Sequence, residues 1–127
     1  MITVFYDGKC SLCYSEIEYY KRTGPEAVFE WVDITVDSSI IQKLGITYAD
    51  GLKILHAQDS NGKLHMGVDA FLLIWRKIPG WRLLAIIVDI PIIRLIVDIA
   101  YRIFAAWRFK RLEHCQIALK ADDVTKN

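Results

Sequence analysis

The chain has 127 residues and a mass of 14.6 kDa, enough for one compact domain and too little for two. Its 54% hydrophobic and 24% charged residues exclude a disordered chain and a low-complexity repeat. Sixteen basic and 15 acidic residues give a net charge of +1, which excludes a global field that recruits nucleic acid, and three cysteines are too few for a disulfide scaffold.

The first half of the chain alternates between strands and helices. Residues 2–6 are β-branched and aromatic, which predicts a strand, and a helix over residues 11–22 follows the turn at Asp7-Gly8. A second strand is expected over residues 28–34. Residues 40–44 are predicted to form a short helix, which is capped by the preceding serines and ends at Gly45.

The second half begins with a hairpin, because residues 52–58 and 63–66 flank Asn61-Gly62, the strongest short-range hairpin signal. A helix over residues 68–77 and two more after Pro79, with a joint at Pro91, complete the order.

Strands joined by a helix are parallel, whereas a hairpin is antiparallel. The order therefore predicts an α/β, thioredoxin-like fold, with a four-stranded mixed sheet, flanking helices and an added C-terminal helical hairpin. We expect a single domain over residues 1–120, made of a core (1–78) and a helical extension (79–120), and a mobile polar tail over 121–127.

Residues 83–107 are as rich in Leu, Ile, Val and Phe as a membrane span, but four charges interrupt them: Asp89, Arg94, Asp98 and Arg102. At mid-bilayer these charges cost about 10–14 kcal/mol, and the apolar residues return roughly 4–8 kcal/mol. We therefore expect amphipathic helices whose wide apolar face is covered by the core, a second subunit or a membrane surface. With no secretory signal recognisable, the expected location is the cytoplasm, with peripheral membrane contact as an option.

Two cysteines, Cys10 and Cys13, lie between the first strand and its helix. Free backbone N–H groups and the helix dipole stabilise a thiolate on Cys10, and Lys9 adds a positive charge. Cys13 is one helical turn further, close enough for a disulfide, and is expected to be the less exposed thiol. Because an anion opposes a neighbouring thiolate, Asp7 is expected to accept the Cys13 proton or to cap the turn.

Other chemistry-bearing residues have simpler explanations. A structural zinc site needs four ligands, and the only second cluster, His114-Cys115, should diverge on a helix, so we expect no metal and no cofactor. His56 is a candidate proton donor to the dithiol, or a hydrogen-bonded strand histidine. Cys115 is expected to be a spare surface or interface thiol. The basic residues Arg108, Lys110 and Arg111 suit a helix C-terminus or an anionic membrane surface.

The block Tyr6-Asp7-Gly8-Lys9-Cys10-Ser11-Leu12-Cys13 resembles the signature of the DCC family of thiol-disulfide oxidoreductases, named for its Asp and two Cys. Later blocks are similar to that family to about Trp107: Leu55-His56, Asn61-Gly62, Gly67-Val68-Asp69-Ala70, Ile78-Pro79-Gly80-Trp81 and Tyr101-Arg102-Ile103-Phe104-Ala105. The resemblance implies a thioredoxin-like fold and redox activity. Ordinary thioredoxins carry a cis-proline before the third strand, which docks extended substrates, but no proline directly precedes residues 52–58 here.

These residues predict a thiol-disulfide oxidoreductase in which Cys10 attacks a disulfide, Cys13 resolves the mixed disulfide and Asp7 assists. The predicted substrate-binding residues are Tyr6, Gly8, His56 and Gly67. The expected partners are a disulfide-containing protein or a low-molecular-weight thiol, not nucleic acid, with a homodimer or peripheral membrane contact through the helices after Pro79. The alternative is a non-enzymatic thioredoxin-like adaptor, whose apolar C-terminal helices bind a membrane protein or form a homodimer.

Overall fold

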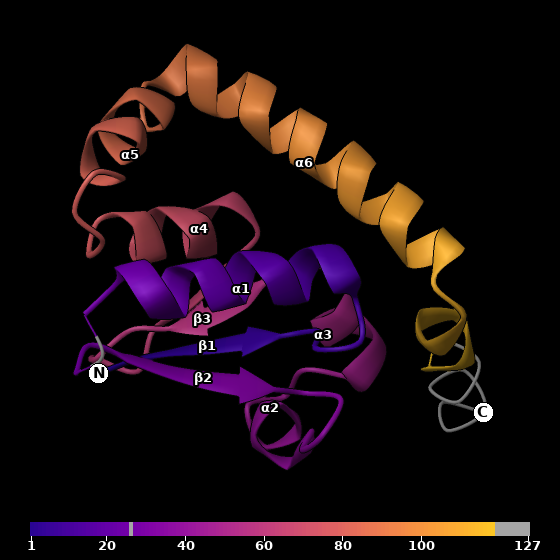
Figure 1. Cartoon of the computed structure of the whole chain (residues 1–127). Coiled ribbons are helices and arrows are strands. Elements are labelled where there is room, and N and C mark those ends of the chain that lie inside the picture. Colours follow the sequence, from indigo (N-terminus) through magenta and orange to yellow (C-terminus); the bar gives the residue numbers. More distant parts are fainter. Residues whose placement is uncertain (26, 119–127) are drawn as a thin grey trace.

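The computed structural model describes residues 1–25 and 27–118, so the predicted tail at 121–127 and the predicted domain end at residue 120 lie outside the described residues (Figure 1). The elements in chain order are β1 (Ile2–Tyr6), α1 (Ser11–Thr23), β2 (Phe29–Asp33), α2 (Ser39–Lys43), α3 (Tyr48–Lys53), β3 (His56–Gln58), β4 (Leu64–Met66), α4 (Val68–Trp75), α5 (Arg82–Val88) and α6 (Pro91–Arg111). Residues 113–118 are also helical.

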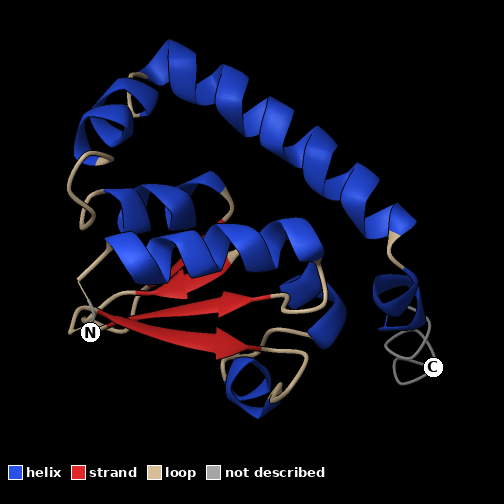
Figure 2. Ribbon diagram, in the orientation of Figure 1, coloured by secondary structure: helices blue, strands red, loops and turns tan. Residues whose placement is uncertain are grey.

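The four strands form one mixed sheet in the order β2-β1-β3-β4 (Figure 2). β1 and β2 are parallel, as expected of strands joined through α1, while β1 pairs antiparallel with β3, and β3 with β4. In the predicted hairpin turn, Asp59 Oδ1 accepts the backbone N–H groups of Asn61 and Lys63. The predicted α/β fold with a four-stranded mixed sheet is therefore confirmed.

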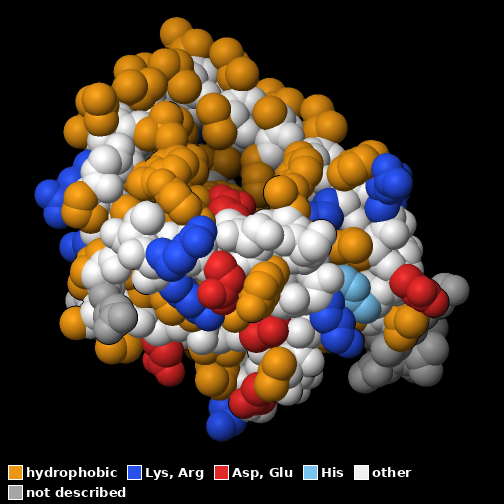
Figure 3. Space-filling model, in the orientation of Figure 1, with side chains coloured by type: hydrophobic (Ala, Val, Ile, Leu, Met, Phe, Trp, Pro, Cys, Tyr) orange, Lys and Arg blue, Asp and Glu red, His pale blue; other side chains and the backbone are white. Residues whose placement is uncertain are grey.

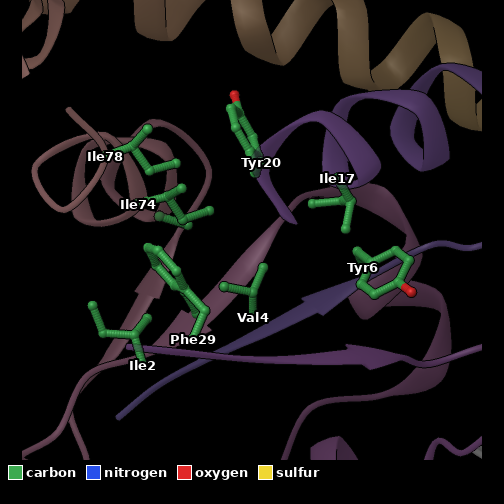
Figure 4. Packing of buried hydrophobic residues seen from close by; sticks show 10 residues of the cluster. Ile2, Val4, Tyr6, Ile17, Tyr20, Phe29, Ile74 and Ile78 are labelled. Carbon is green, nitrogen blue, oxygen red and sulfur yellow. The ribbon is translucent and has the colours of Figure 1, made fainter. Parts of the chain in front are cut away.

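The two faces of the sheet carry separate cores, because side chains alternate along β1. Val4 and Tyr6 pack with Ile17 and Tyr20 of α1 and with Ile74 of α4 (Figure 4). Phe5 belongs to the opposite core, together with α2, α3 and the C-terminal segment: Ile34, Ile41, Ile46, Ala49, Leu52, Phe109, Cys115 and Ala118.

The predicted strand over residues 52–58 is wrong at its beginning, because α3 ends at Lys53 and the strand starts only at His56. Thr47 caps α3 by accepting the Asp50 N–H at 3.2 Å, and Ala49 and Leu52 are buried against the second core. Helix capping and burial therefore place residues 52 and 53 in α3, a helix that the sequence analysis did not predict.

Two helices, α5 and α6, form the predicted C-terminal hairpin, and α6 begins at Pro91, where the sequence predicts a joint. α6 runs back along α1 and α4 to the end of the sheet at which β1 finishes (Figure 1). Arg102 pairs with Asp98 along α6, whereas Arg94 pairs with Asp69 of α4 and with Asp89, just before α6. Among the described helices, none combines the length and the apolar character that a membrane crossing requires.

The outer side of these two helices is a continuous hydrophobic surface, visible as the orange ridge in Figure 3. We name it the α5–α6 apolar face and define it by its exposed members: Leu83, Ile86, Ile92, Leu95, Ile96, Ile99, Ile103 and Trp107. The most exposed member, Ile92, keeps 75% of its surface accessible. The sequence predicted this wide apolar face, and the described chain leaves it uncovered.

Candidate functional site

The cysteine pair lies in the loop that joins β1 to α1, and short polar contacts hold that loop. Asp7 Oδ1 accepts the Lys9 N–H at 3.0 Å, and Asp33 Oδ1, at the end of β2, accepts the Gly8 N–H at 3.0 Å. A Cβ on Gly8 would overlap the Asp33 carboxylate, so only glycine fits there. The predicted turn-capping role of Asp7 is therefore present as a hydrogen bond.

Cys10 is the N-cap residue of α1, with an extended backbone (φ −85°, ψ 114°). Its Sγ accepts the backbone N–H of Cys13 at 3.4 Å, within the limit for sulfur acceptors. The sulfur thus takes the place of the oxygen that usually caps a helix. Both residues are free cysteines. This arrangement provides the donor that the sequence predicted for a thiolate on Cys10.

The exposure of the two cysteines is the reverse of the prediction. Cys10 retains only 3% of its surface, whereas Cys13 is half-buried and lines a pocket. A segment from Arg108 to Cys115 packs over the loop at the N-terminus of α1. Depth along α1 was the basis of the prediction, but the covering segment comes from the far end of the chain.

The pocket beside Cys13 is narrow, about 50 Å³, and mostly apolar. It opens between α1 and α6, where Figure 3 shows hydrophobic side chains in a hollow. Its lining includes Leu12, Ile17, Leu55, Phe71, Tyr101 and Phe104, with Asp7, Glu16 and Arg108 as charged members. The cysteine pair therefore adjoins a site suited to an apolar group.

The pKa of the Cys13 thiol is raised well above its ordinary value. Burial is the largest cause, followed by the hydrogen bond with Cys10, while the charge of Arg108 acts in the opposite direction. Burial acts to lower the pKa of the Arg108 guanidinium. Electrostatic interactions with the nearby Cys13, Cys10 and Asp7 outweigh burial, so the pKa of Arg108 is raised. Cys13 is therefore a protonated thiol at neutral pH, next to a permanent positive charge.

Asp7 is the centre of a buried polar network that sequence analysis did not find. The carboxylate is 4% exposed and accepts hydrogen bonds from Arg108 Nη1 at 3.4 Å and His114 Nε2 at 2.9 Å. Cys115 Sγ lies 3.8 Å from Asp7 Oδ2 and 3.7 Å from His114 Nε2. Arg108 also donates to the carbonyls of Leu52 and Lys53 at the end of α3.

Two predictions about this segment are therefore wrong. Cys115 is fully buried and is no surface thiol. His114 and Cys115 do not diverge, because both reach Asp7. The basic cluster lies in the last turn of α6, as predicted for a helix C-terminus, and within it Arg108 is buried as the partner of Asp7, whereas Lys110 and Arg111 are exposed. The sequence holds one signal, two ligand-type residues side by side, but nothing local connects them to a residue more than 100 positions earlier.

The predicted substrate-binding residues do not gather at one place. Tyr6 lines the Cys13 pocket, and Gly8 belongs to the cysteine loop. His56 pairs with Phe5 across the sheet, so its side chain shares the opposite face, and its Nδ1 contacts Ile54 O at 3.0 Å. Gly67 is the N-cap residue of α4 and has a positive φ of 62°. It lies next to the Tyr101 ring but does not line the Cys13 pocket.

Comparison with known proteins gives a family match over most of the chain. A family model described as DCC1-like thiol-disulfide oxidoreductase matches residues 4–113, which include both cysteines of the pair and Asp7. An uncharacterized chloroplastic protein of Arabidopsis thaliana is 29% identical over 112 residues, which cover 86% of this chain and 51% of the relative. The chain thus spans about half the length of that curated relative. No solved structure matches.

Proposed function

Because the chain belongs to the DCC1-like thiol-disulfide oxidoreductase family, we propose that Cys10 and Cys13 form the dithiol that exchanges with a substrate disulfide. One observation carries this assignment: the Cys10 sulfur accepts the N–H of Cys13 at the N-terminus of α1. That hydrogen bond stabilises a thiolate on Cys10 and keeps the two residues within a single helical turn, where a disulfide between them closes a small ring.

The exchange proceeds in two displacements. The Cys10 thiolate attacks one sulfur of the substrate disulfide, a mixed disulfide forms, and the first substrate sulfur leaves as a thiolate. Cys13 then loses its proton and attacks the Cys10 sulfur, which releases the second substrate thiolate and leaves a Cys10–Cys13 disulfide. The substrate gains two electrons and, from water and Cys13, two protons. A low-molecular-weight thiol or a second protein dithiol returns the pair to its reduced form.

The proton of Cys13 needs an acceptor, and two carboxylates are candidates. Asp7 is the acceptor predicted from the sequence, but hydrogen bonds from Lys9, Arg108 and His114 already occupy its oxygens. Glu16 lies three residues beyond Cys13 on α1, and both Glu16 and Asp7 line the Cys13 pocket. Burial raises the pKa of Glu16, although the hydrogen bond from Tyr20 opposes this. A carboxylate with a raised pKa is the better base, so we assign the proton to Glu16.

The pocket supports a substrate with an apolar group next to its disulfide. Leu12, Phe71 and Phe104 contribute apolar lining beside Cys13. The backbone N–H of Leu55, just before β3, donates to the Tyr101 hydroxyl oxygen at 3.0 Å, so it is engaged and does not pair with an extended substrate strand. The apolar lining and the engaged Leu55 N–H favour two kinds of substrate: a small-molecule disulfide, or a protein disulfide that is flanked by apolar side chains.

The deciding experiment is a redox titration in glutathione buffers, with alkylation of free thiols and peptide mapping by mass spectrometry. We expect a single two-electron transition between the dithiol and a Cys10–Cys13 disulfide, which is lost in Cys10→Ser and in Cys13→Ser. A bridge that includes Cys115, or no bridge across the titration, contradicts the proposal.

A non-enzymatic adaptor is the second candidate, because one observation favours it. The α5–α6 apolar face exposes eight large hydrophobic side chains, and such patches mark interaction sites, so a second copy, a membrane protein or a lipid surface covers it in this alternative. The two functions are separable, since the adaptor requires the apolar face and the exchange requires the cysteines. An intact redox transition in a chain with a polar substitution on that face assigns the chemistry to the dithiol alone.

A further inference from the structure

Asp7, His114 and Cys115 bring three different metal-ligating atoms into one buried cluster. All of their donor atoms lie within 4.8 Å of one another. Asp7 and Cys115 are buried, and the His114 side chain is 19% exposed to solvent. We propose that these three residues bind a zinc ion, with water as the fourth ligand, at a site separate from the Cys10–Cys13 dithiol.

The distances match what zinc requires. A tetrahedral zinc ion at ~2.0 Å from oxygen and nitrogen and ~2.3 Å from sulfur holds its O and N donors about 3.3 Å apart and its sulfur about 3.6 Å from each. In the structure the Asp7 oxygen and the His114 nitrogen are 2.9 Å apart. The Cys115 sulfur lies 3.8 Å from that oxygen and 3.7 Å from that nitrogen. Each separation needs to change by less than about 0.5 Å to reach the tetrahedral values.

The charges and protons also balance. Zinc replaces the Cys115 thiol proton, which is released to water, and the His114 proton moves from Nε2 to Nδ1, so that Nε2 becomes a ligand. The two anionic ligands, Asp7 and the Cys115 thiolate, neutralise Zn²⁺. Arg108 keeps its hydrogen bonds to the Leu52 and Lys53 carbonyls and orients the Asp7 carboxylate as an outer-shell partner.

The donor set selects the class of metal. A thiolate, an imidazole and a carboxylate together suit zinc, whereas calcium and magnesium prefer oxygen ligands alone. The ion joins the loop before the dithiol to the segment after α6, so that binding stabilises the folded chain by mass action. Neither Cys10 nor Cys13 is a ligand, so metal binding can be measured in a chain that lacks the proposed exchange reaction.

Cobalt(II) titration of a Cys10→Ser/Cys13→Ser variant tests the site. This variant leaves Cys115 as the last thiol of the three in the sequence, so a thiolate-to-cobalt charge-transfer band reports Cys115 alone. We expect one equivalent of cobalt, the visible bands of a tetrahedral ion, and their displacement by one equivalent of zinc. In the wild-type chain, zinc should raise the thermal unfolding temperature, and a chelator should reverse the increase.

His114→Gln on the same background should weaken cobalt binding by more than the roughly 10- to 100-fold that loss of an outer-shell partner costs. His65→Gln is the matched control, because His65 Nε2 also contacts a carboxylate, Asp59, at 2.9 Å, and it should leave binding unchanged. If His114→Gln does not fold by circular dichroism, Cys115→Ser serves instead and should abolish the charge-transfer band. The proposal is overturned if the double variant binds no cobalt, if His114→Gln folds and binds as tightly as its parent, or if the bands survive Cys115→Ser.

Discussion

The carboxylate of Asp7 and the guanidinium of Arg108 lie 3.4 Å apart and are both buried, although 101 positions separate them in the chain. Asp7 begins the dithiol loop, and Arg108 is near the end of α6. This ion pair therefore connects the C-terminal helix to the loop that positions Cys10. Its burial makes it a point at which a single substitution affects both stability and the site.

Removing the cation of this pair leaves a buried carboxylate without its charge partner. Arg108→Met should lower the free energy of unfolding by about 3 kcal/mol, the lower end of the range for breaking a buried pair, because His114 still contacts Asp7. Urea unfolding monitored by tryptophan fluorescence measures the change. Arg102→Met is the control: its pair with Asp98 is mostly exposed and should contribute less than about 1 kcal/mol.

The two cysteines should differ in their ability to trap a substrate. Cys13→Ser lacks the resolving thiol and should accumulate long-lived mixed disulfides through Cys10, whereas Cys10→Ser should accumulate few. Non-reducing mass spectrometry after incubation with an apolar aromatic disulfide measures both. The better access of Cys13 favours the opposite result. If Cys10→Ser is the better trap, access outweighs thiolate stabilisation and the assigned order of attack is wrong.

Glu16 and Asp7 can be separated by the step that each affects. Glu16→Gln should slow the release of the second substrate thiol several-fold without slowing the first, because the proton of Cys13 has lost its acceptor. Glu18→Gln is the control on the same helix, where Glu18 pairs with Lys21 instead. Rapid-mixing kinetics with a chromogenic disulfide resolves the two steps. If the second step is slow in Asp7→Asn and normal in Glu16→Gln, Asp7 is the acceptor of the Cys13 proton and the assignment to Glu16 is wrong.

His56 should make the folded chain sensitive to acid. Burial lowers its pKa below the ordinary value, although the contact with the Ile54 carbonyl acts in the opposite direction. The folded state therefore binds the proton less readily than the unfolded state does. The resulting stability is present above the unfolded pKa of about 6.5 and is lost as pH falls through the lower folded value.

Unfolding free energies of the wild type and of His56→Gln, measured in urea at pH 7.5 and pH 5, check this expectation. The decline in stability between the two pH values should be smaller in the variant. Equal declines would show that His56 does not contribute to the acid sensitivity.

The α5–α6 apolar face should be covered in solution. We expect a dimer by sedimentation velocity, or binding to anionic vesicles in flotation, and the double substitution Ile96→Glu/Ile99→Glu should abolish either. Ser60→Glu, in the exposed hairpin turn, is the control for the added negative charge. A wild-type monomer that does not bind vesicles contradicts both forms of coverage.

Local patterns in the sequence were sufficient for most of the elements. The β-branched run of β1, the turn signals at Asp7-Gly8 and Asn61-Gly62 and the break at Pro91 each act over a few residues, and the structure confirms the elements that they predict. The largest error, the missed helix α3 and the late start of β3, arose because the helical state of residues 52–53 depends on the Thr47 cap and on burial against Phe5 and Ile41.

The sequence by itself determined the order of the strands and of the helices other than α3, the position of the cysteine pair at the start of α1 and the apolar face of α5 and α6, because turn chemistry, capping and periodicity are properties of neighbouring residues. Only the tertiary structure decided that Arg108, His114 and Cys115 meet Asp7, and that Cys10 is covered while Cys13 lines a pocket. Those outcomes depend on where a 21-residue helix returns across the sheet. Packing of its two ends against distant elements sets that path, and no local pattern encodes it.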